Sequence, residues 1–62
     1  MLIRNITLAY EGHEYVYKIE EKTDTRAMMI AIHRLEEHLH KVRGGLVKHF
    51  KQNPDDVSLR IY

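Results

Sequence analysis

The chain has 62 residues, no cysteine and a formal net charge of +1 at pH 7. A chain of this length forms one domain, residues 1–62, which buries only about 60% of the surface that its unfolded form exposes. The composition excludes disulfides and thiolate metal sites, and the near-neutral charge excludes a strongly basic, dedicated nucleic-acid-binding protein. Because the core is small and has no covalent support, we expect the chain to self-associate as a homodimer.

Charge is distributed unevenly along the chain. Residues 11–24 hold five carboxylates and two lysines, whereas residues 38–51 hold four Lys or Arg side chains and no carboxylate. No apolar run approaches the roughly 18 residues that a membrane span needs. The N-terminal residues lack the basic and long apolar regions of a signal peptide. We therefore expect a cytoplasmic protein that does not enter a membrane.

Two stretches of alternating polarity predict a β-hairpin. In residues 2–10 the alternation is interrupted only by Arg4, and residues 14–21 alternate in the same way. The three-residue link Glu11-Gly12-His13 contains a glycine that can adopt positive φ, as hairpin turns require.

Residues 24–43 have the periodicity of one long amphipathic helix. The side chains of Thr23, Asp24 and Thr25 can cap its start, and Gly44-Gly45 can take the left-handed geometry of a helix C-terminus. The apolar stripe expected to face the core comprises Met28, Ala31, Ile32, Leu35, Leu39, Val42 and Leu46.

The C-terminal third predicts a turn and a strand. Residues 46–52 keep helical periodicity and favour a short helical turn, although their length also suits a strand. Residues 53–56, Asn-Pro-Asp-Asp, are typical of a turn. Residues 57–62 alternate and predict a third strand.

The predicted fold is α+β, with the order β-β-α-β and a small three-stranded antiparallel sheet in the order 2-1-3. A right-handed crossover through the helix places the third strand beside the first. The helix covers one face of the sheet, and the other face is left to solvent, to a second copy or to a partner. The expected core of the sheet is Ile6, Leu8, Tyr15, Tyr17, Ile19, Leu59 and Ile61, and the open face carries Ile3, Ala9, Val16 and Tyr62.

No motif for catalysis or cofactor binding is present, so we expect neither an enzyme nor a cofactor. The candidate metal ligands are His33, Glu36 or Glu37, and His40, with Met29 one turn before them. His33 and His40 are seven residues apart, about 10 Å along a helix, which is too far to share one ion without a second chain. Solvated histidines are the preferred interpretation.

Protein binding is the favoured function. We expect Ile30, beside Met29, to form an apolar spot on the outer face of the helix, and methionine adapts well to irregular partners. A single exposed isoleucine is also common without any function. The expected role is that of a regulator, adaptor or inhibitor, such as phages and mobile elements encode, acting through the outer helix face or a sheet edge. The candidate protein-binding residues are Met29, Ile30, His33, Arg34, Glu37 and His40.

The alternative function is nucleic-acid binding through the basic segment. Lys and Arg near a helix C-terminus also complement the helix dipole, so their presence alone does not indicate phosphate binding. Four charges give a salt slope of at most about four, which corresponds to weak binding. The candidate residues are Lys41, Arg43, Lys48, His49 and Lys51.

Overall fold

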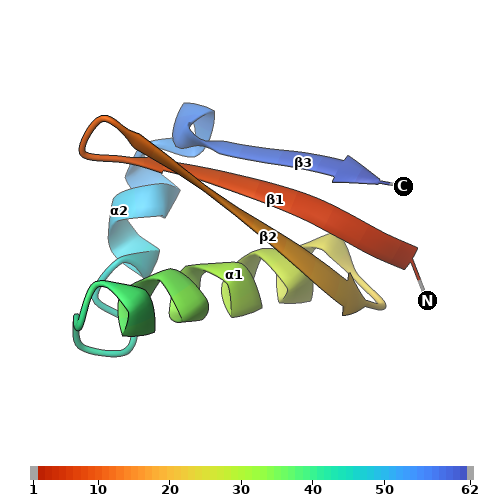
Figure 1. Ribbon diagram of the computed structural model, residues 1–62, viewed down its shortest axis with the longest axis horizontal. Coiled ribbons are helices and arrows are strands. Elements are labelled where there is room, and N and C mark those ends of the chain that lie inside the picture. The colour runs from red at the N-terminus through yellow and green to blue at the C-terminus, as the bar shows by residue number, and fades with distance from the viewer. Residues whose placement is uncertain (1, 62) are drawn as a thin grey trace.

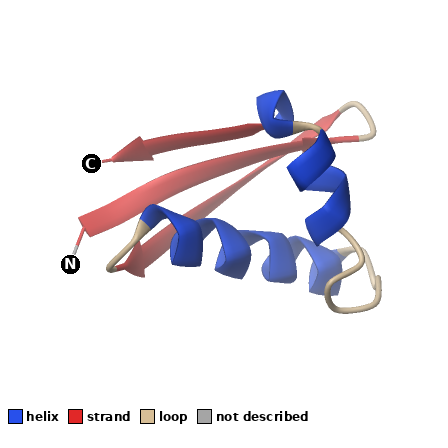
Figure 2. Ribbon diagram, turned by 180° about the vertical axis from the view of Figure 1, so that it is seen from behind, coloured by secondary structure: helices blue, strands red, loops and turns tan. Residues whose placement is uncertain are grey.

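The computed structural model describes residues 2–61, and for Ile61 it describes only the backbone. The chain forms a three-stranded antiparallel sheet with its helices on one face (Figures 1 and 2). The strand order is β2-β1-β3, so the predicted α+β fold and sheet order are confirmed. The elements are β1 (Leu2–Tyr10), β2 (His13–Glu21), α1 (Asp24–His38), α2 (Val47–Gln52), the 3-10 turn η1 (Pro54–Asp56) and β3 (Val57–Ile61).

The hairpin between β1 and β2 closes through a two-residue turn. Tyr10 pairs with His13, so the turn contains only Glu11 and Gly12, and the predicted three-residue link was wrong. Glu11 has φ 50° and Gly12 has φ 78°. Positive φ at both positions matches the twist of the flanking strands, which favours this tight turn. His13 therefore belongs to β2.

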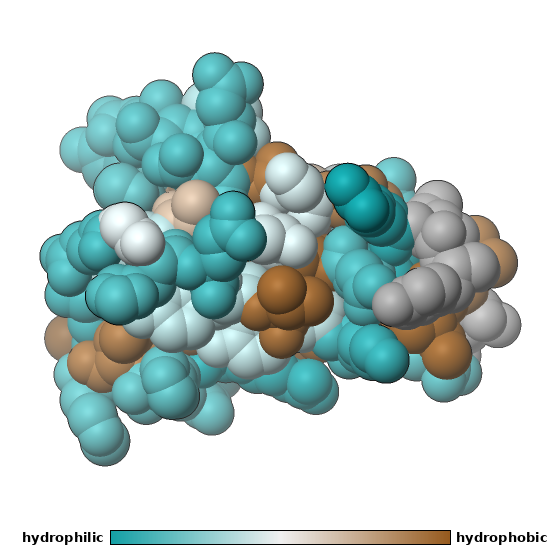
Figure 3. All heavy atoms as spheres, turned by 45° about the horizontal axis from the view of Figure 1, so that its top comes forward, coloured by the Kyte–Doolittle hydropathy of each residue, from teal (hydrophilic) through white to brown (hydrophobic). Residues whose placement is uncertain are grey.

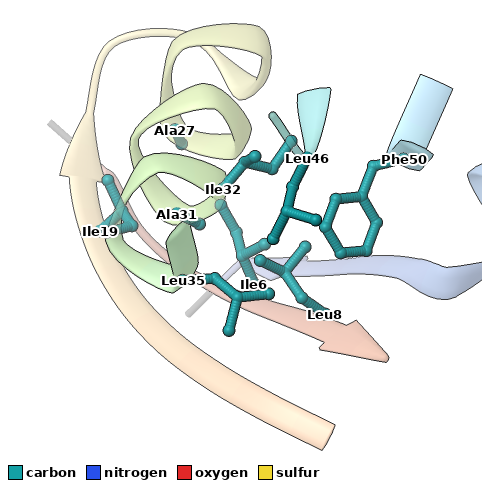
Figure 4. Packing of buried hydrophobic residues seen from close by; sticks show 9 residues of the cluster. All are labelled: Ile6, Leu8, Ile19, Ala27, Ala31, Ile32, Leu35, Leu46 and Phe50. Atoms are coloured by element: carbon teal, nitrogen blue, oxygen red, sulfur yellow. The ribbon is translucent and has the colours of Figure 1, made fainter. Parts of the chain in front are cut away.

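The core lies between the sheet and the two helices (Figure 4). Of the predicted core residues of the sheet, Ile6, Leu8 and Ile19 are buried. Tyr15, Tyr17 and Leu59 are half-buried and pack against the core. The predicted core position of Ile61 and face position of Tyr62 lie outside the described side chains. The nine buried apolar residues are Ile6, Leu8, Ile19, Ala27, Ala31, Ile32, Leu35, Leu46 and Phe50.

Arg4, which interrupts the alternation of β1, lies on the helix-facing side of the sheet and is 5% exposed. Its Nε donates to Oδ1 of Asp24 at 2.5 Å. Its Nη1 donates to the backbone carbonyl of Glu21. A buried guanidinium is stable only with such partners. Arg4 therefore joins β1 to the end of β2 and the start of α1.

The start of α1 agrees with the prediction, but its end does not. Thr23, one of the three predicted capping residues, is the N-cap, and its hydroxyl accepts a hydrogen bond from the Arg26 amide at 3.2 Å. The predicted C-terminal end at Arg43 was wrong, because α1 ends at His38. His40 takes a left-handed conformation with φ 57°, and Lys41 N–H donates to the Glu36 carbonyl at 2.8 Å. These are the features of a Schellman motif, here built without glycine.

Residues 39–46 form a loop between α1 and α2. Val42 is 82% exposed, so its predicted position on the core stripe was wrong, because the helix has already ended before it. Leu46 and Phe50 return to the core, and the predicted helical turn near residues 46–52 is confirmed as α2. Within residues 2–61, no helix is long and apolar enough to cross a membrane.

Candidate functional site

The joint between α1 and α2 is built around the carboxylate of Glu36, which is 1% exposed. Oε1 accepts from His33 Nδ1 and from the Gly44 amide, both at 2.8 Å. Oε2 accepts from the Leu46 amide at 2.8 Å. Three donors from two segments thus converge on one buried side chain, and we call this group the Glu36 anchor. It holds the loop that leads into α2 against the last turns of α1.

Burial raises the pKa of Glu36, but the hydrogen bonds from His33, Gly44 and Leu46 lower it by more. The net result is a pKa below the ordinary value of 4.5. Hydrogen bonds to the charged form stabilise a buried carboxylate in this way. Gly44, whose amide donates to the carboxylate, has φ 89°, a left-handed conformation that glycine adopts without strain. The Glu36 anchor is therefore charged at neutral pH.

An apolar cleft opens where α1 and α2 diverge, on the side of the helices away from β2. Figure 2 shows α2 turning away from α1 after the connecting loop, with η1 above it. The cleft has a volume of about 320 Å³, and its wall is almost entirely apolar. We call it the α1–α2 cleft. It is lined by Thr25, Met28, Met29, Ile32, Val47, Phe50, Lys51, Pro54 and Val57.

The predicted protein-binding residues do not form one surface. Met29 is half-buried and lines the α1–α2 cleft. Ile30 is half-buried and packs against the core, so its predicted outward position was wrong. The reason is that α1 lies across β2 as well as β1, which widens its apolar face beyond the predicted stripe. His33 is bonded to Glu36. Arg34, Glu37 and His40 are exposed.

The end of α1 separates the candidate metal ligands from one another. His40 lies in the loop, two residues beyond the helix, and Glu36 turns its carboxylate to backbone amides. In the part of the chain that the structure describes, no group of three or more His, Cys, Asp or Glu residues is placed to hold a metal ion. Other histidines contact aromatic rings instead, as His38 does with Tyr15 at 5.7 Å between centroids.

Most of the basic segment lies at the surface, and Lys41 is one of its exposed residues. Arg43, Lys48 and Lys51 are exposed, and Lys51 also lines the α1–α2 cleft. The ring of His49 is half-buried, and its centroid lies 5.0 Å from that of Tyr10. Lys41 lies over the Tyr10 ring, with Nζ 5.7 Å from the ring centroid. Of the five candidate phosphate contacts, His49 and Lys41 thus have aromatic partners.

The sheet face opposite the helices is partly apolar. Ile3 is 43% exposed and Val16 is 59% exposed, while Ala9 is half-buried. Val16 of β2, Thr7 of β1 and Ser58 of β3 form a row across this face, because Thr7 pairs with both of the others. Figure 3 shows a hydrophobic patch in the middle of the view, between surface of intermediate and of hydrophilic character, with further hydrophobic surface toward both sides of the view.

Sequence reasoning missed the Glu36 anchor and most of the α1–α2 cleft. Glu36 lies beside apolar positions of α1, and Gly44-Gly45 follows within one loop, so a buried carboxylate meeting free amides could have been considered. No sequence pattern indicated the cleft, because its lining residues come from α1, α2, η1 and β3. Their arrangement depends on the path of the loop between α1 and α2. No protein-family model, curated protein or solved structure matches this chain.

Proposed function

We propose that this chain is a small, non-enzymatic protein-binding module that receives an apolar side chain of a partner protein in the α1–α2 cleft. The observation that carries the proposal is the cleft itself, an open hollow of about 320 Å³ with an almost entirely apolar wall. Apolar pockets with few polar groups are the usual place where a protein holds a ligand or an anchor residue.

The wall of the cleft suits a partner side chain that is large and apolar. Met28 and Met29 lie together on its α1 side, and methionine adapts its shape to irregular partners. Phe50 gives a rigid aromatic surface on the α2 side. A Leu or Phe side chain from a partner helix or extended segment fits this chemistry.

The rim of the cleft favours a partner with a carboxylate next to its apolar anchor. Lys51 is exposed and lines the cleft. Lys48 is exposed one turn before Lys51 on α2. Opposite charge on the partner adds orientation and speed of association. We therefore expect an acidic residue beside the anchor. A regulator, adaptor or inhibitor of a larger protein acts through such a short-segment contact.

The proposal is tested by selecting displayed random peptides on the immobilised protein and measuring the affinity of the selected peptides. We expect enrichment of peptides with a Leu, Ile or Phe anchor beside Asp or Glu. Met29→Lys places a charge in the cleft and should abolish their binding. Arg34→Glu is the matched control, because Arg34 is an exposed residue of α1 that does not line the cleft. Peptides that bind Met29→Lys as tightly as the original protein would refute the proposal.

Nucleic-acid binding is the second candidate, because Arg43, Lys48 and Lys51 are all exposed around α2. Phosphate contacts give binding that weakens steeply with salt. Fluorescence anisotropy with single-stranded and double-stranded oligonucleotides at low salt would detect it, and Lys48→Glu/Lys51→Glu should abolish it. No binding at low salt would eliminate this candidate.

A further inference from the structure

The outer edge of β2 is the longest open backbone edge of the described sheet. β2 is nine residues long and has a neighbour, β1, on one side only. The other edge strand, β3, has five residues. In an antiparallel ladder every second residue of an edge strand turns its N–H and C=O groups away from the sheet. Such an edge is a template for another strand.

The side chains of β2 restrict how another strand could pair with it. Glu14, Val16 and Lys18 are exposed on the open face of the sheet. Tyr15 and Tyr17 are half-buried on the helix face. A second β2 strand continues both faces only if residues of the same face stand opposite each other. This condition leaves a small number of registers for a symmetric antiparallel pair.

We propose that two copies of this chain pair through β2, antiparallel, around a two-fold axis at Val16. In this register Glu14 stands opposite Lys18 of the second copy, and Lys18 stands opposite its Glu14. Val16 meets Val16, and Tyr15 meets Tyr17 on the helix face. Opposite charges and apolar side chains directly across a strand pair stabilise it.

The neighbouring registers lack this complementarity. An axis at Tyr17 places Glu14 opposite Glu20, and an axis at Lys18 places two lysines opposite each other. An axis at Tyr15 places Glu14 opposite Val16 and forms no ion pair. Like charges directly across a strand pair are destabilising. The charges of β2 therefore select one register among those that keep the faces aligned.

The resulting dimer has a continuous six-stranded sheet with the helices of both copies on the same face. The two Val16 side chains meet at the centre of the open face. Within each copy, Val16 is also paired with Thr7 of β1. A symmetric pair of this kind is closed, so it does not extend into fibres. The α1–α2 cleft lies toward β3, at the far side of the sheet from β2, so both clefts stay accessible. The dimer is thus independent of the proposed peptide binding.

Sedimentation equilibrium of charge variants tests the dimer. We expect Lys18→Glu and Glu14→Lys each to weaken dimerisation by about tenfold, because two ion pairs become two repulsive pairs. The combined Glu14→Lys/Lys18→Glu variant should restore it, because the charges are exchanged. Arg60→Glu is the matched control, since Arg60 is exposed on β3. A protein that stays monomeric throughout the concentration series, or a combined variant as weak as the single ones, would overturn the proposal.

Cysteine substitution tests the register, because the chain contains no cysteine. Val16→Cys should form an intermolecular disulfide on oxidation, since the two Cα atoms lie within disulfide reach across a strand pair. Lys18→Cys should not, because the two substituted residues are four positions apart along the pair. Both sites are exposed, and circular dichroism checks that each variant is folded. Crosslinking of Lys18→Cys, or none of Val16→Cys, would overturn the register.

Discussion

The two sides of the angle between α1 and α2 differ in chemistry: the closed side, at the connecting loop, is polar and hydrogen-bonded, and the open side, at the cleft, is apolar. At the closed side, the Glu36 anchor fixes the loop with three hydrogen bonds of 2.8 Å to one buried carboxylate. At the open side, the α1–α2 cleft has an almost entirely apolar wall, and none of the side chains that line it, all of which the structure describes, forms one of the described side-chain hydrogen bonds. Directional polar bonds specify one arrangement, whereas apolar surface accepts many. The difference shows how a small chain can fix the position of a helix and still keep an adaptable surface.

The largest expected effect comes from removing the charge of the anchor. Glu36→Gln replaces a carboxylate oxygen by an amide donor, so one buried backbone amide loses its acceptor. We expect a loss of about 3 kcal/mol in the free energy of unfolding, measured by urea denaturation. Glu37→Gln is the matched control, because Glu37 is the next residue and is exposed. Equal stability of the two variants would show that the closed side is not fixed by Glu36.

Acid should also lower the free energy of unfolding, because protonation removes the charge of Glu36. The pKa of Glu36 is lowered in the folded protein, so the unfolded chain binds this proton more readily. The stabilising contribution of Glu36 is complete above its ordinary pKa of 4.5. It is lost as the pH falls from there through the lowered pKa of the folded state. Denaturation between pH 6 and acid should therefore show a decline of stability that is smaller in Glu36→Gln. An identical pH profile for the two proteins would contradict the role of the anchor.

A smaller effect is expected from the glycine that presents its amide to the anchor. Gly44 has φ 89°, and a Cβ at this position meets nothing within 4 Å. Gly44→Ala therefore tests conformational strain without a clash, and we expect a loss of about 1–2 kcal/mol. Thermal denaturation measures it. A variant as stable as the original would indicate that the loop can deliver its amide in another conformation.

The smallest effect on stability should come from the open side. Met29 is half-buried in the wall of the cleft, so Met29→Ala should cost less than about 1 kcal/mol. The same substitution should weaken binding of the selected peptides clearly, because it removes part of the wall that they contact. A large loss of stability in Met29→Ala would place Met29 in the core and weaken the distinction between the two sides.

Local patterns in the sequence were sufficient to predict the fold. The alternation of residues 2–10 and 14–21, the cap at Thr23 and the periodicity of α1 each depend on neighbouring residues, and the structure has all of them. The strand order followed from the handedness of the crossover.

The errors in the second half of the chain concern where α1 ends and how the loop after it runs. The end of α1 is set by His40 in a left-handed conformation, a role usually taken by glycine, and the loop is then held by Glu36. Once the helix ends at His38, Val42 leaves the predicted stripe, and α2 can take the direction that opens the cleft. None of these contacts is visible in the spacing of apolar residues. The sequence therefore predicted only two of the cleft's lining residues as binding residues, Met29 for a protein partner and Lys51 for nucleic acid.

We propose above all that a partner protein binds in the α1–α2 cleft. NMR titration with a selected peptide tests this most directly. Amide chemical shifts of the ¹⁵N-labelled protein are followed as the peptide is added. We expect the largest changes at the cleft residues Met28, Met29, Val47 and Phe50, and small changes along β2. Largest changes along β2, or at Arg43 and Lys48 without the cleft, would contradict it.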